Sequence, residues 1–487
     1  MRIFGSSVFR GGNSLTVKLH HDPEACQLPA RRGMACPSLQ SLRTRQRILR
    51  CAFGLIWLIG ALGLLVTQAC KKAKETKAPI TITIIDQNWP DAAYQRQRNE
   101  EFLRFTNETG IEVEVVPSPE GAVEQLEVWR KLLNSHATVP DVFAMDVIWP
   151  AILGDQLLDL KPYIPAQEIA EQFPGLISNF TVKGRLVAFP YNLSEGLLYY
   201  RTDLLRKYGY RAPPRTWEEL ETEAARIQAG ERAQGQKDFW GFVWQGASSE
   251  ALTSNALEWQ ASEGGGTIIE DGAITVNNPR AIWAWKRAAS WPGSISPPSV
   301  VAYTEWDAFN RWKEGQAVFM RNWSSAYVVA SAKDSPVRGR FAISALPGGP
   351  AGVRGTLGGS GYAVSRYSLH PREAAMLVRF LCGRDEQLKR SQEPSEPPTI
   401  PELYSNPSVL AANPYFSTVL EEYQKGIAIR PSTMTGKAYP DVSRAYFEAV
   451  HAVLIHKATA EGAAAELERK LTQITGFRPD PSAAKDR

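Results

Sequence analysis

Hydrophobic and polar positions alternate in some short segments of the chain and recur every three or four residues in longer ones. In the part that follows residue 78, strands are predicted at 79–85, 110–116 and 140–145. The helical period predicts helices at 91–107, 121–135 and 150–158. Strands and helices that alternate in this way form right-handed βαβ units, so a mostly parallel sheet is expected.

The same order resumes further along the chain. Strands are predicted at 197–201, 239–244, 317–321, 340–345 and 362–364. Helices are predicted at 216–230, 252–264, 279–289, 306–315, 371–382 and 440–477. The glycine-rich stretch 347–361 is predicted to be a loop. Two α/β lobes fit this pattern better than one sheet, and ligands commonly bind in the crevice between such lobes, at the carboxyl ends of the strands.

The beginning of the chain has the pattern of an export signal. Arginines at 43–50 precede the uncharged residues 52–66, and Thr67-Gln68-Ala69-Cys70 follows. A positive segment, an apolar segment and a small residue before the cut describe a secretory signal. Cys70 indicates a lipoprotein, in which the acylated thiol becomes the new N-terminus, and an uncleaved membrane anchor is the alternative.

The leader is therefore expected to occupy residues 1–70, with 1–33 as a mis-called start, and residues 71–78 form a charged tether. Everything after the leader is expected outside the cytoplasm, in the periplasm or at the cell surface, held at the membrane by the lipid.

Charge and cysteine content sharpen this interpretation. The 487 residues carry a formal charge of +4, but only 42 basic against 48 acidic residues lie from 79 onward, a net −6. A mildly acidic exported body argues against nucleic-acid binding. Beyond the apolar segment only Cys70 and Cys382 remain, so no disulfide framework is expected. Cys382 lies in an apolar helical pattern and is predicted to be a buried small hydrophobe.

Familiar catalytic motifs are missing from the sequence. It contains no phosphate-binding glycine loop, no H-E-x-x-H, no C-x-x-C and no G-x-S-x-G. His451 and His456 are five positions apart, a poor spacing for one metal ion. No enzymatic activity, catalytic residue, cofactor or metal is therefore expected. Paired carboxylates need no fixed spacing, so an anchored glycoside hydrolase stays open as an alternative.

Tryptophan is the informative residue type, because thirteen of the fourteen lie beyond residue 70. Sugar rings have apolar C–H faces and many hydroxyls, so a carbohydrate site needs flat aromatic surfaces beside Asp, Glu, Asn and Arg. Trp323, in a polar loop after a predicted strand, and Tyr303 are candidate platforms for such a ligand. Four others are predicted to pack in cores: Trp240, Trp244, Trp283 and Trp285.

Several runs of residues resemble one protein family. The run DVFAMDVIWP at 141–150 is similar to a segment of the extracellular solute-binding proteins of sugar ABC transporters. Other runs resemble the trehalose- and maltose-binding branch: GLLYYR at 196–201, KYGY at 207–210, TW at 216–217, FWGFVWQG at 239–246, ISPP at 295–298, FMRNW at 319–323, DSPV at 334–337, TLGG at 356–359 and RP at 430–431. The resemblance extends in order from residue 80 to 475 or thereabouts.

This resemblance implies a fold. It is a two-lobed α/β periplasmic-binding-protein fold of the maltose-binding-protein-like type II class, with a multi-segment hinge and the ligand cleft between the lobes. The N-terminal lobe is expected to comprise 79–190 plus 362–405, and the C-terminal lobe 193–358 plus 410–478. The chain is expected to cross between them near Pro190–Glu195, Gly358–Tyr362 and Glu402–Ala412.

The resemblance also implies binding residues at matching positions. Asp146 matches a sugar-binding Asp after the third strand, Trp323 an aromatic platform, and Arg430 an Arg that reaches a sugar hydroxyl. Gly358 and Gly359 match a loop whose backbone approaches the ligand. The alternatives are a helix cap for Asp146, a surface charge for Arg430 and a hinge turn for the glycines.

Other candidate contacts are less direct. Asp91 roughly matches an acidic ligand contact, with a helix cap as its alternative. The sequence departs from the branch where Ser194 replaces an Asp, between Asn192 and Glu195, and where Ser360 replaces a Trp. Asn192, Ser194 and Glu195 are included among the candidate contacts, and the altered positions leave the identity of the sugar open.

The function implied is capture of a di- or oligosaccharide, trehalose- or maltose-like, and its delivery to the permease subunits of an ABC transporter. The expected partners are the sugar, the permease and, through the lipid anchor, the membrane. No nucleic acid is expected, and the chain is expected to be a monomer. A sugar-sensing module for a separate receptor is the second alternative, beside the glycosidase.

Overall fold

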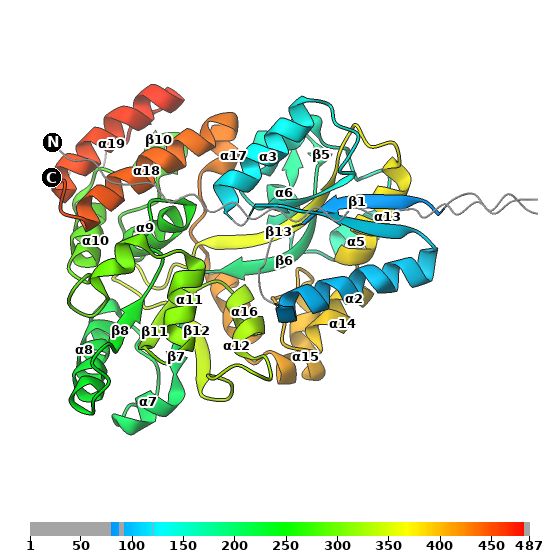
Figure 1. The fold of residues 1–487 in the computed structure, drawn as a ribbon. Coiled ribbons are helices and arrows are strands. Elements are labelled where there is room, and N and C mark those ends of the chain that lie inside the picture. The colour runs from blue at the N-terminus through cyan, green and yellow to red at the C-terminus, as the bar shows by residue number, and fades with distance from the viewer. Residues whose placement is uncertain (1–78, 87–91, 120, 482–487) are drawn as a thin grey trace, which may run out of the picture. The chain divides into compact units, whose positions relative to one another are not determined.

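Figure 1 shows the computed structural model, which describes residues 79–86, 92–119 and 121–481. The expectations for the leader with Cys70, for the tether and for Asp91 concern residues outside these ranges. Within the described part of the chain, no helix is long and apolar enough to cross a membrane. The uncharged residues 52–66 lie outside that part.

The first sheet begins with the predicted βαβ pattern. β1 (Thr81–Ile85) pairs in parallel with β2 (Glu112–Val116) and with β3 (Val142–Asp146). The connecting helices are α2 (Ala92–Thr109) and α3 (Ala122–Asn134). Two strands from later in the chain complete the sheet, in the order β2-β1-β3-β13-β6. They are β6 (Phe189–Glu195) and β13 (Leu357–Val364), and β13 is antiparallel to both of its neighbours.

The second sheet has four strands in the order β12-β7-β11-β8. They are β7 (Leu197–Arg201), β8 (Trp240–Val243), β11 (Ala317–Asn322) and β12 (Phe341–Ala345). β7 is antiparallel to β11 and β12, whereas β11 and β8 are parallel. The sequence correctly predicted the α/β class and two sheets. The prediction that the strands are mostly parallel was wrong. Both sheets are mixed, because strands distant in sequence insert antiparallel.

The longer helices lie mostly where the sequence periodicity predicts them, although those at 384–391 and 416–425 were not predicted and the single helix predicted at 440–477 is two. They are α8 (Trp217–Ala233), α9 (Glu250–Ser262), α10 (Pro279–Ala289), α11 (Glu305–Lys313), α13 (Pro371–Cys382), α14 (Arg384–Ser391), α16 (Phe416–Lys425), α18 (Tyr439–Leu454) and α19 (Ala460–Thr475). Local capping explains where several of them begin. Asn278 accepts hydrogen bonds from two backbone N–H groups of α10, and Thr304 and Asp307 form a capping box on α11.

Short elements connect these units. The helical ones are α4 (Pro150–Leu153), η1 (Gly154–Gln156), α5 (Ala166–Ala170), α6 (Pro174–Asn179), α7 (Thr202–Lys207), η2 (Pro298–Ala302), α12 (Ser325–Ala330), η3 (Pro401–Ser405), α15 (Pro407–Ala412), α17 (Ser432–Thr435) and η4 (Gly436–Ala438). The short strands are β4 (Thr181–Val182), β5 (Arg185–Leu186), β9 (Ile269–Glu270), β10 (Ala273–Ile274) and β14 (Arg478–Pro479).

The glycine-rich segment predicted as a loop contains most of the central strand β13. Its glycines are needed for close backbone approach. A Cβ atom added to Gly359 would lie 2.4 Å from the carbonyl oxygen of Asn192, and one added to Gly361 would lie 2.6 Å from that of Phe189. The strand therefore fits between its neighbours only because these positions lack side chains.

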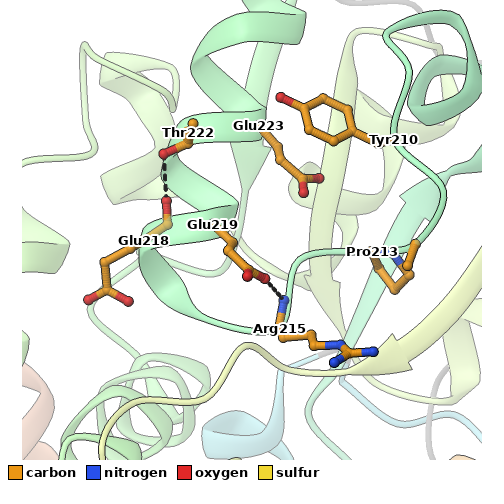
Figure 2. A pocket seen from close by; sticks show the side chains of 8 residues that line it. Tyr210, Pro213, Arg215, Glu218, Glu219, Thr222 and Glu223 are labelled. Atoms are coloured by element: carbon orange, nitrogen blue, oxygen red, sulfur yellow. Dashed lines mark hydrogen bonds between the residues drawn. The ribbon is translucent and has the colours of Figure 1, made fainter.

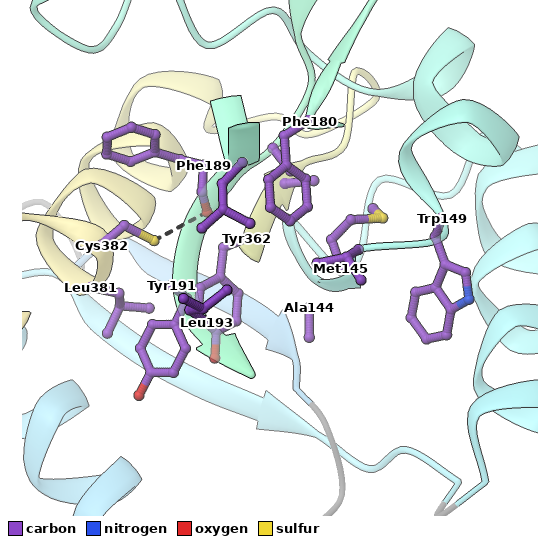
Figure 3. Close-up of a cluster of buried hydrophobic side chains, with 14 of the residues drawn as sticks. Ala144, Met145, Trp149, Phe180, Phe189, Tyr191, Leu193, Tyr362, Leu381 and Cys382 are labelled. Carbon is purple, nitrogen blue, oxygen red and sulfur yellow. Dashed lines mark hydrogen bonds between the residues drawn. The ribbon is translucent and has the colours of Figure 1, made fainter. Parts of the chain in front are cut away.

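A large hydrophobic core surrounds the first sheet. Figure 3 shows part of it, where Phe189 of β6 and Tyr362 of β13 lie near Leu381 and Cys382 of α13. Cys382 is fully buried and its thiol contacts the carbonyl oxygen of Phe189, which confirms the prediction for this residue. Burial also raises the pKa of the Cys382 thiol, which keeps it protonated.

The second core contains a cluster of tryptophans. Trp244, Trp259 and Trp291 pack edge to face, with ring centroids 5.0–6.1 Å apart. Trp285 is also buried, as predicted. The prediction was wrong for Trp283, which is 54% exposed, because the side of α10 that carries it faces away from the core.

A buried charged network joins the helices to the first sheet. Arg98 of α2 pairs with Asp86 at 3.0 Å and with Glu101, and it donates to the hydroxyl of Tyr191 at 2.6 Å. Arg390 of α14 reaches Glu101 at 3.3 Å. Because each charge has an opposite partner, the network is tolerated in a dry environment and fixes α2 and α14 against β6.

We expect a Gly359→Ala variant to unfold more easily than the wild type, by about 2–4 kcal/mol. The added methyl group would clash with the Asn192 carbonyl, and the φ of +111° is unfavourable for a residue with a side chain.

Gly272→Ala is the matched control. Gly272 also has a positive φ, of +78°, but an added Cβ would have nothing within 4 Å, so only about 1 kcal/mol should be lost. Urea unfolding followed by circular dichroism compares the two variants, and equal losses would contradict the close-approach explanation.

Candidate functional site

The first residues of β13 bring several predicted site residues together. The backbone N–H of Val147, directly after Asp146, donates to the carbonyl oxygen of Gly359 at 3.3 Å. A Cβ atom added to Gly358 would lie 2.8 Å from the Trp323 ring. Arg430 donates to the carbonyl oxygen of Leu357, at the start of the strand, at 3.0 Å. The beginning of β13, which contains Gly358 and Gly359, is thus surrounded by Asp146, Trp323 and Arg430.

Asp146 is the last residue of β3. Its carboxylate accepts the backbone N–H of Ile148 at 3.1 Å, a local turn, whereas α4 begins at Pro150 with no side-chain cap. The helix-cap alternative is therefore wrong. Burial raises the pKa of Asp146, and the nearby charges of Glu250 and Glu305 raise it further, while Arg430 and the bond from Ile148 oppose this.

Arg430 is buried, with only 4% of its surface exposed, so the surface-charge alternative is also wrong. Its Nη1 lies 2.9 Å from Oε1 of Glu250, and its Nη2 lies 3.9 Å from Oδ1 of Asp146. The guanidinium therefore stands between a carboxylate on α9 and a carboxylate at the end of β3.

Trp323 follows β11 and is half-buried. The guanidinium of Arg321 lies 4.0 Å from the ring centroid, and Arg321 is itself paired with Glu258, Nε to Oε2, at 3.0 Å. Both members of this pair are 1% exposed. The ring thus lies against a buried cation, and the edge of its six-membered part is close to the backbone of Gly358.

Asn192 and Ser194 lie on β6 and are hydrogen-bonded within the protein. The Asn192 side-chain oxygen accepts from the backbone N–H of Ser360 at 2.6 Å and from its hydroxyl at 2.9 Å. The Ser324 hydroxyl donates to Oγ of Ser194 at 2.7 Å. The two serines that depart from the family pattern are therefore both engaged with neighbouring polar side chains.

Glu195 is one residue further along β6 and therefore faces the other side of the strand from Ser194. It is 2% exposed, and its Oε1 has no hydrogen-bond partner among the described residues. Burial raises the pKa of Glu195 well above its ordinary value, and the charges of Glu422 and Glu258 add to the shift. The structure therefore places Glu195 apart from the Trp323 ring, next to Gly355.

Tyr303 is a C-terminal cap of η2, and its hydroxyl accepts a hydrogen bond from Ser299 at 3.1 Å. The described contacts do not join it to Asp146 or Trp323. Asp91 lies outside the described residues. Of the ten predicted site residues, five thus gather around the beginning of β13 and three lie on β6, the strand that pairs with it. Tyr303 lies elsewhere, and Asp91 has no described position.

Sequence reasoning missed four residues that support the gathered five: Glu250, Glu258, Tyr439 and Ser443. Glu250 opens α9 and resembled an ordinary acidic residue in the first turn of a helix. One signal was available for Glu258, because it lies in a helix that, apart from Glu250 at its start, is apolar or uncharged and is buried along almost its whole length. A charged residue in such a helix needs a buried partner, and Arg321 at the end of an apolar strand is that partner.

Figure 2 shows a separate surface pocket at the beginning of α8, where Tyr210, Pro213 and Glu223 line the hollow. None of the predicted site residues lines it. Burial and the neighbouring Glu219 raise the pKa of Glu223 to about 7. Among the described residues, no group of three or more His, Cys, Asp or Glu is arranged to hold a metal ion.

Comparisons with known proteins identify the architecture. A family model described as bacterial extracellular solute-binding protein matches residues 86–388. A probable ABC transporter-binding protein of Deinococcus radiodurans is 44% identical over 374 residues, which cover 76% of this chain and 89% of that protein.

Solved structures are similar as well. Maltose-bound T. maritima MalE3 is 32% identical with a TM-score of 0.75, over 81% of this chain and all of that one. The GacH receptor of Streptomyces glaucescens is 20% identical with a TM-score of 0.72, over 82% of this chain and 100% of that chain. These likenesses confirm the predicted α/β periplasmic-binding-protein fold of the maltose-binding type.

Glu195 should make the stability of the protein depend on pH. Its raised pKa means that the folded state keeps a proton that the unfolded chain releases near pH 4.5, the ordinary value. The stability contributed by the neutral carboxyl is therefore complete below that pH and is lost as pH rises through the folded pKa.

A Glu195→Gln variant should lose less stability than the wild type between about pH 4 and pH 8. Free energies of urea unfolding across this range measure the difference. Glu421→Gln is the control, since the Glu421 side chain is 64% exposed and should leave the pH profile unchanged. Parallel profiles for wild type and Glu195→Gln would show that Glu195 is ionised in the folded protein.

Proposed function

Because the chain belongs to the bacterial extracellular solute-binding protein family, we propose that it captures a di- or oligosaccharide outside the cytoplasm and delivers it to a membrane permease. As the substrate-binding component of an ABC transporter, the protein is not an enzyme. The proposal concerns the class of solute, which we take to be trehalose- or maltose-like.

The observation that carries this proposal is the position of Trp323 beside Asp146 and Arg430, around the side-chain-free backbone of Gly358 and Gly359. An indole ring can cover the C–H face of a sugar, while a carboxylate accepts and a guanidinium donates hydrogen bonds to its hydroxyls. Glycine backbone lets a flat ring approach closely. The 32% identity to maltose-bound MalE3 supports the same class of ligand.

Capture would proceed by closure of two lobes over the sugar. We propose that residues 79–190 with 362–405 form one lobe and 193–358 with 410–478 the other. The chain would cross between them near Pro190–Glu195, Gly358–Tyr362 and Glu402–Ala412. The first crossing coincides with the passage from β6 of one sheet to β7 of the other. Lipid at Cys70 would hold the protein at the membrane, close to the permease.

Isothermal titration calorimetry with maltose, trehalose, sucrose and glucose tests the proposal. We expect at least one of the disaccharides to bind, and a Trp323→Ala variant to weaken that binding by about tenfold or more, because a stacked indole contributes at the level of an interface hot spot. Trp283→Ala removes an exposed indole on α10 and should leave the affinity unchanged. The disaccharide assignment fails if none of the four sugars gives heat, and the site assignment fails if Trp323→Ala binds normally.

The charges around the site favour an uncharged ligand. Arg321 is paired with Glu258 and Arg430 with Glu250, while Asp146 and Glu305 add further negative charge. An anionic sugar would bring a like charge close to these carboxylates in a partly dry site. Maltose 1-phosphate or trehalose 6-phosphate should therefore bind at least about tenfold more weakly than the parent sugar when both are measured by calorimetry. Tighter binding of the phosphorylated sugar would contradict this charge argument.

A further inference from the structure

The guanidinium of Arg430 is held by a carboxylate that no sequence motif singles out. Glu250 is the first residue of α9, where the helix dipole favours a negative charge. Its Oε1 lies 2.9 Å from Nη1 of Arg430. The hydroxyls of Tyr439 and Ser443, both on α18, donate to the same carboxylate. Glu250 is thus fixed by three side chains, and its own side chain is only 14% exposed.

Arg430 and Asp146 form a long ion pair that has no hydrogen bond. Nη2 of Arg430 donates to the carbonyl oxygen of Leu357 at 3.0 Å, and the separation of 3.9 Å from Oδ1 of Asp146 is too long for a hydrogen bond. An Arg and an Asp that are free to move would close this gap, because an Arg–carboxylate pair in a buried site is strong and often bidentate. Two acceptors hold the guanidinium back: the Leu357 carbonyl oxygen accepts from Nη2, and the Glu250 carboxylate accepts from Nη1. Glu250 is the charged one of the two.

We propose that Glu250 is a positioning residue of the ligand site, which keeps the Arg430 guanidinium from closing a hydrogen-bonded pair with Asp146. This inference rests on the proposed function, since it concerns the two groups that would bind sugar hydroxyls. In a hydrogen-bonded Arg430–Asp146 pair, N–H donors of Arg430 and carboxylate oxygens of Asp146 would bind each other and would not be available to the sugar. With Glu250 in place, both groups keep hydrogen-bonding capacity directed toward the ligand.

A second role for Glu250 must be distinguished from this one. By accepting hydrogen bonds from α18, Glu250 also joins α9 to α18, and its loss would lower stability by that route alone. A purely structural role would not make the effect of Glu250 on affinity depend on Asp146. The dependence is therefore what the experiment has to measure.

The test is a double-mutant cycle on the full-length protein with Glu250→Gln and Asp146→Asn. Calorimetry uses maltose or trehalose, whichever the wild type binds. Glu250→Gln should weaken binding by about 10–100-fold, because a hydrogen bond to a charged group is lost and Arg430 turns to Asp146. Asp146→Asn should weaken the wild type by a similar factor but should change the Glu250→Gln protein little, since Asp146 is already occupied there.

Glu263→Gln is the matched control. Glu263 follows the last residue of the same helix and pairs with Arg287, and its side chain is 6% exposed against 14% for Glu250, but it does not contact the site. Its affinity for the sugar should stay within about twofold of the wild type. A large effect here would show that any lost ion pair on α9 disturbs binding, and would overturn the specific role of Glu250.

Tyr439→Phe covers the case in which Glu250→Gln does not fold. This variant retains the Glu250 carboxylate and removes one of the hydroxyls that hold it, so the affinity for the sugar should fall several-fold. In a protein that also carries Asp146→Asn, the Tyr439→Phe change should lower the affinity by a smaller factor. Effects that simply add in the cycle overturn the positioning role and leave the sugar-binding function standing. A wild-type protein that binds none of the sugars overturns both together.

Discussion

Close backbone approach along β13 is the constraint on which the rest of the structure depends. The strand fits between β3 and β6 only because Gly359 and Gly361 present no side chain to the carbonyls of Asn192 and Phe189. Its first residues then face Trp323 and Arg430, which belong to other parts of the chain. One strand therefore completes the first sheet, passes toward the second and supplies the backbone around which the candidate site is assembled.

Buried ion pairs give this site its orientation. Charges removed from water require partners, and an arginine whose donors are partly used by a carboxylate has few remaining directions in which to move. Arg321 and Glu258 form such a pair beneath Trp323, and Arg430 and Glu250 form another beside Asp146. The network around Arg98 and Glu101 has the same chemistry but lies between α2, α14 and β6, where it fastens helices to the sheet.

At the two positions that depart from the family pattern, the side chains form hydrogen bonds within the protein. Ser194 and Ser360 contact Ser324 and Asn192, so their polar atoms are engaged within the protein. Glu195, adjacent to Ser194, points to the other side of β6 and is buried, and the part of the chain that the structure describes offers Oε1 no hydrogen-bond partner. Under the proposed function, selection of a particular sugar would rest on Trp323, Asp146 and Arg430.

The sequence by itself determined the α/β class, most long helices and strands, and the family, because these follow from local periodicity, capping and ordered motifs. It also indicated Asp146, Trp323 and Arg430 as candidate ligand contacts, because they occupy positions that match the family's motifs. Tertiary structure alone decided that the glycines near 358 are strand and not loop, since glycine is required there by backbones that are distant in sequence. It alone brought Glu250 to Arg430 and Glu258 to Arg321, since such pairs form between residues 63 or more positions apart and leave no local pattern.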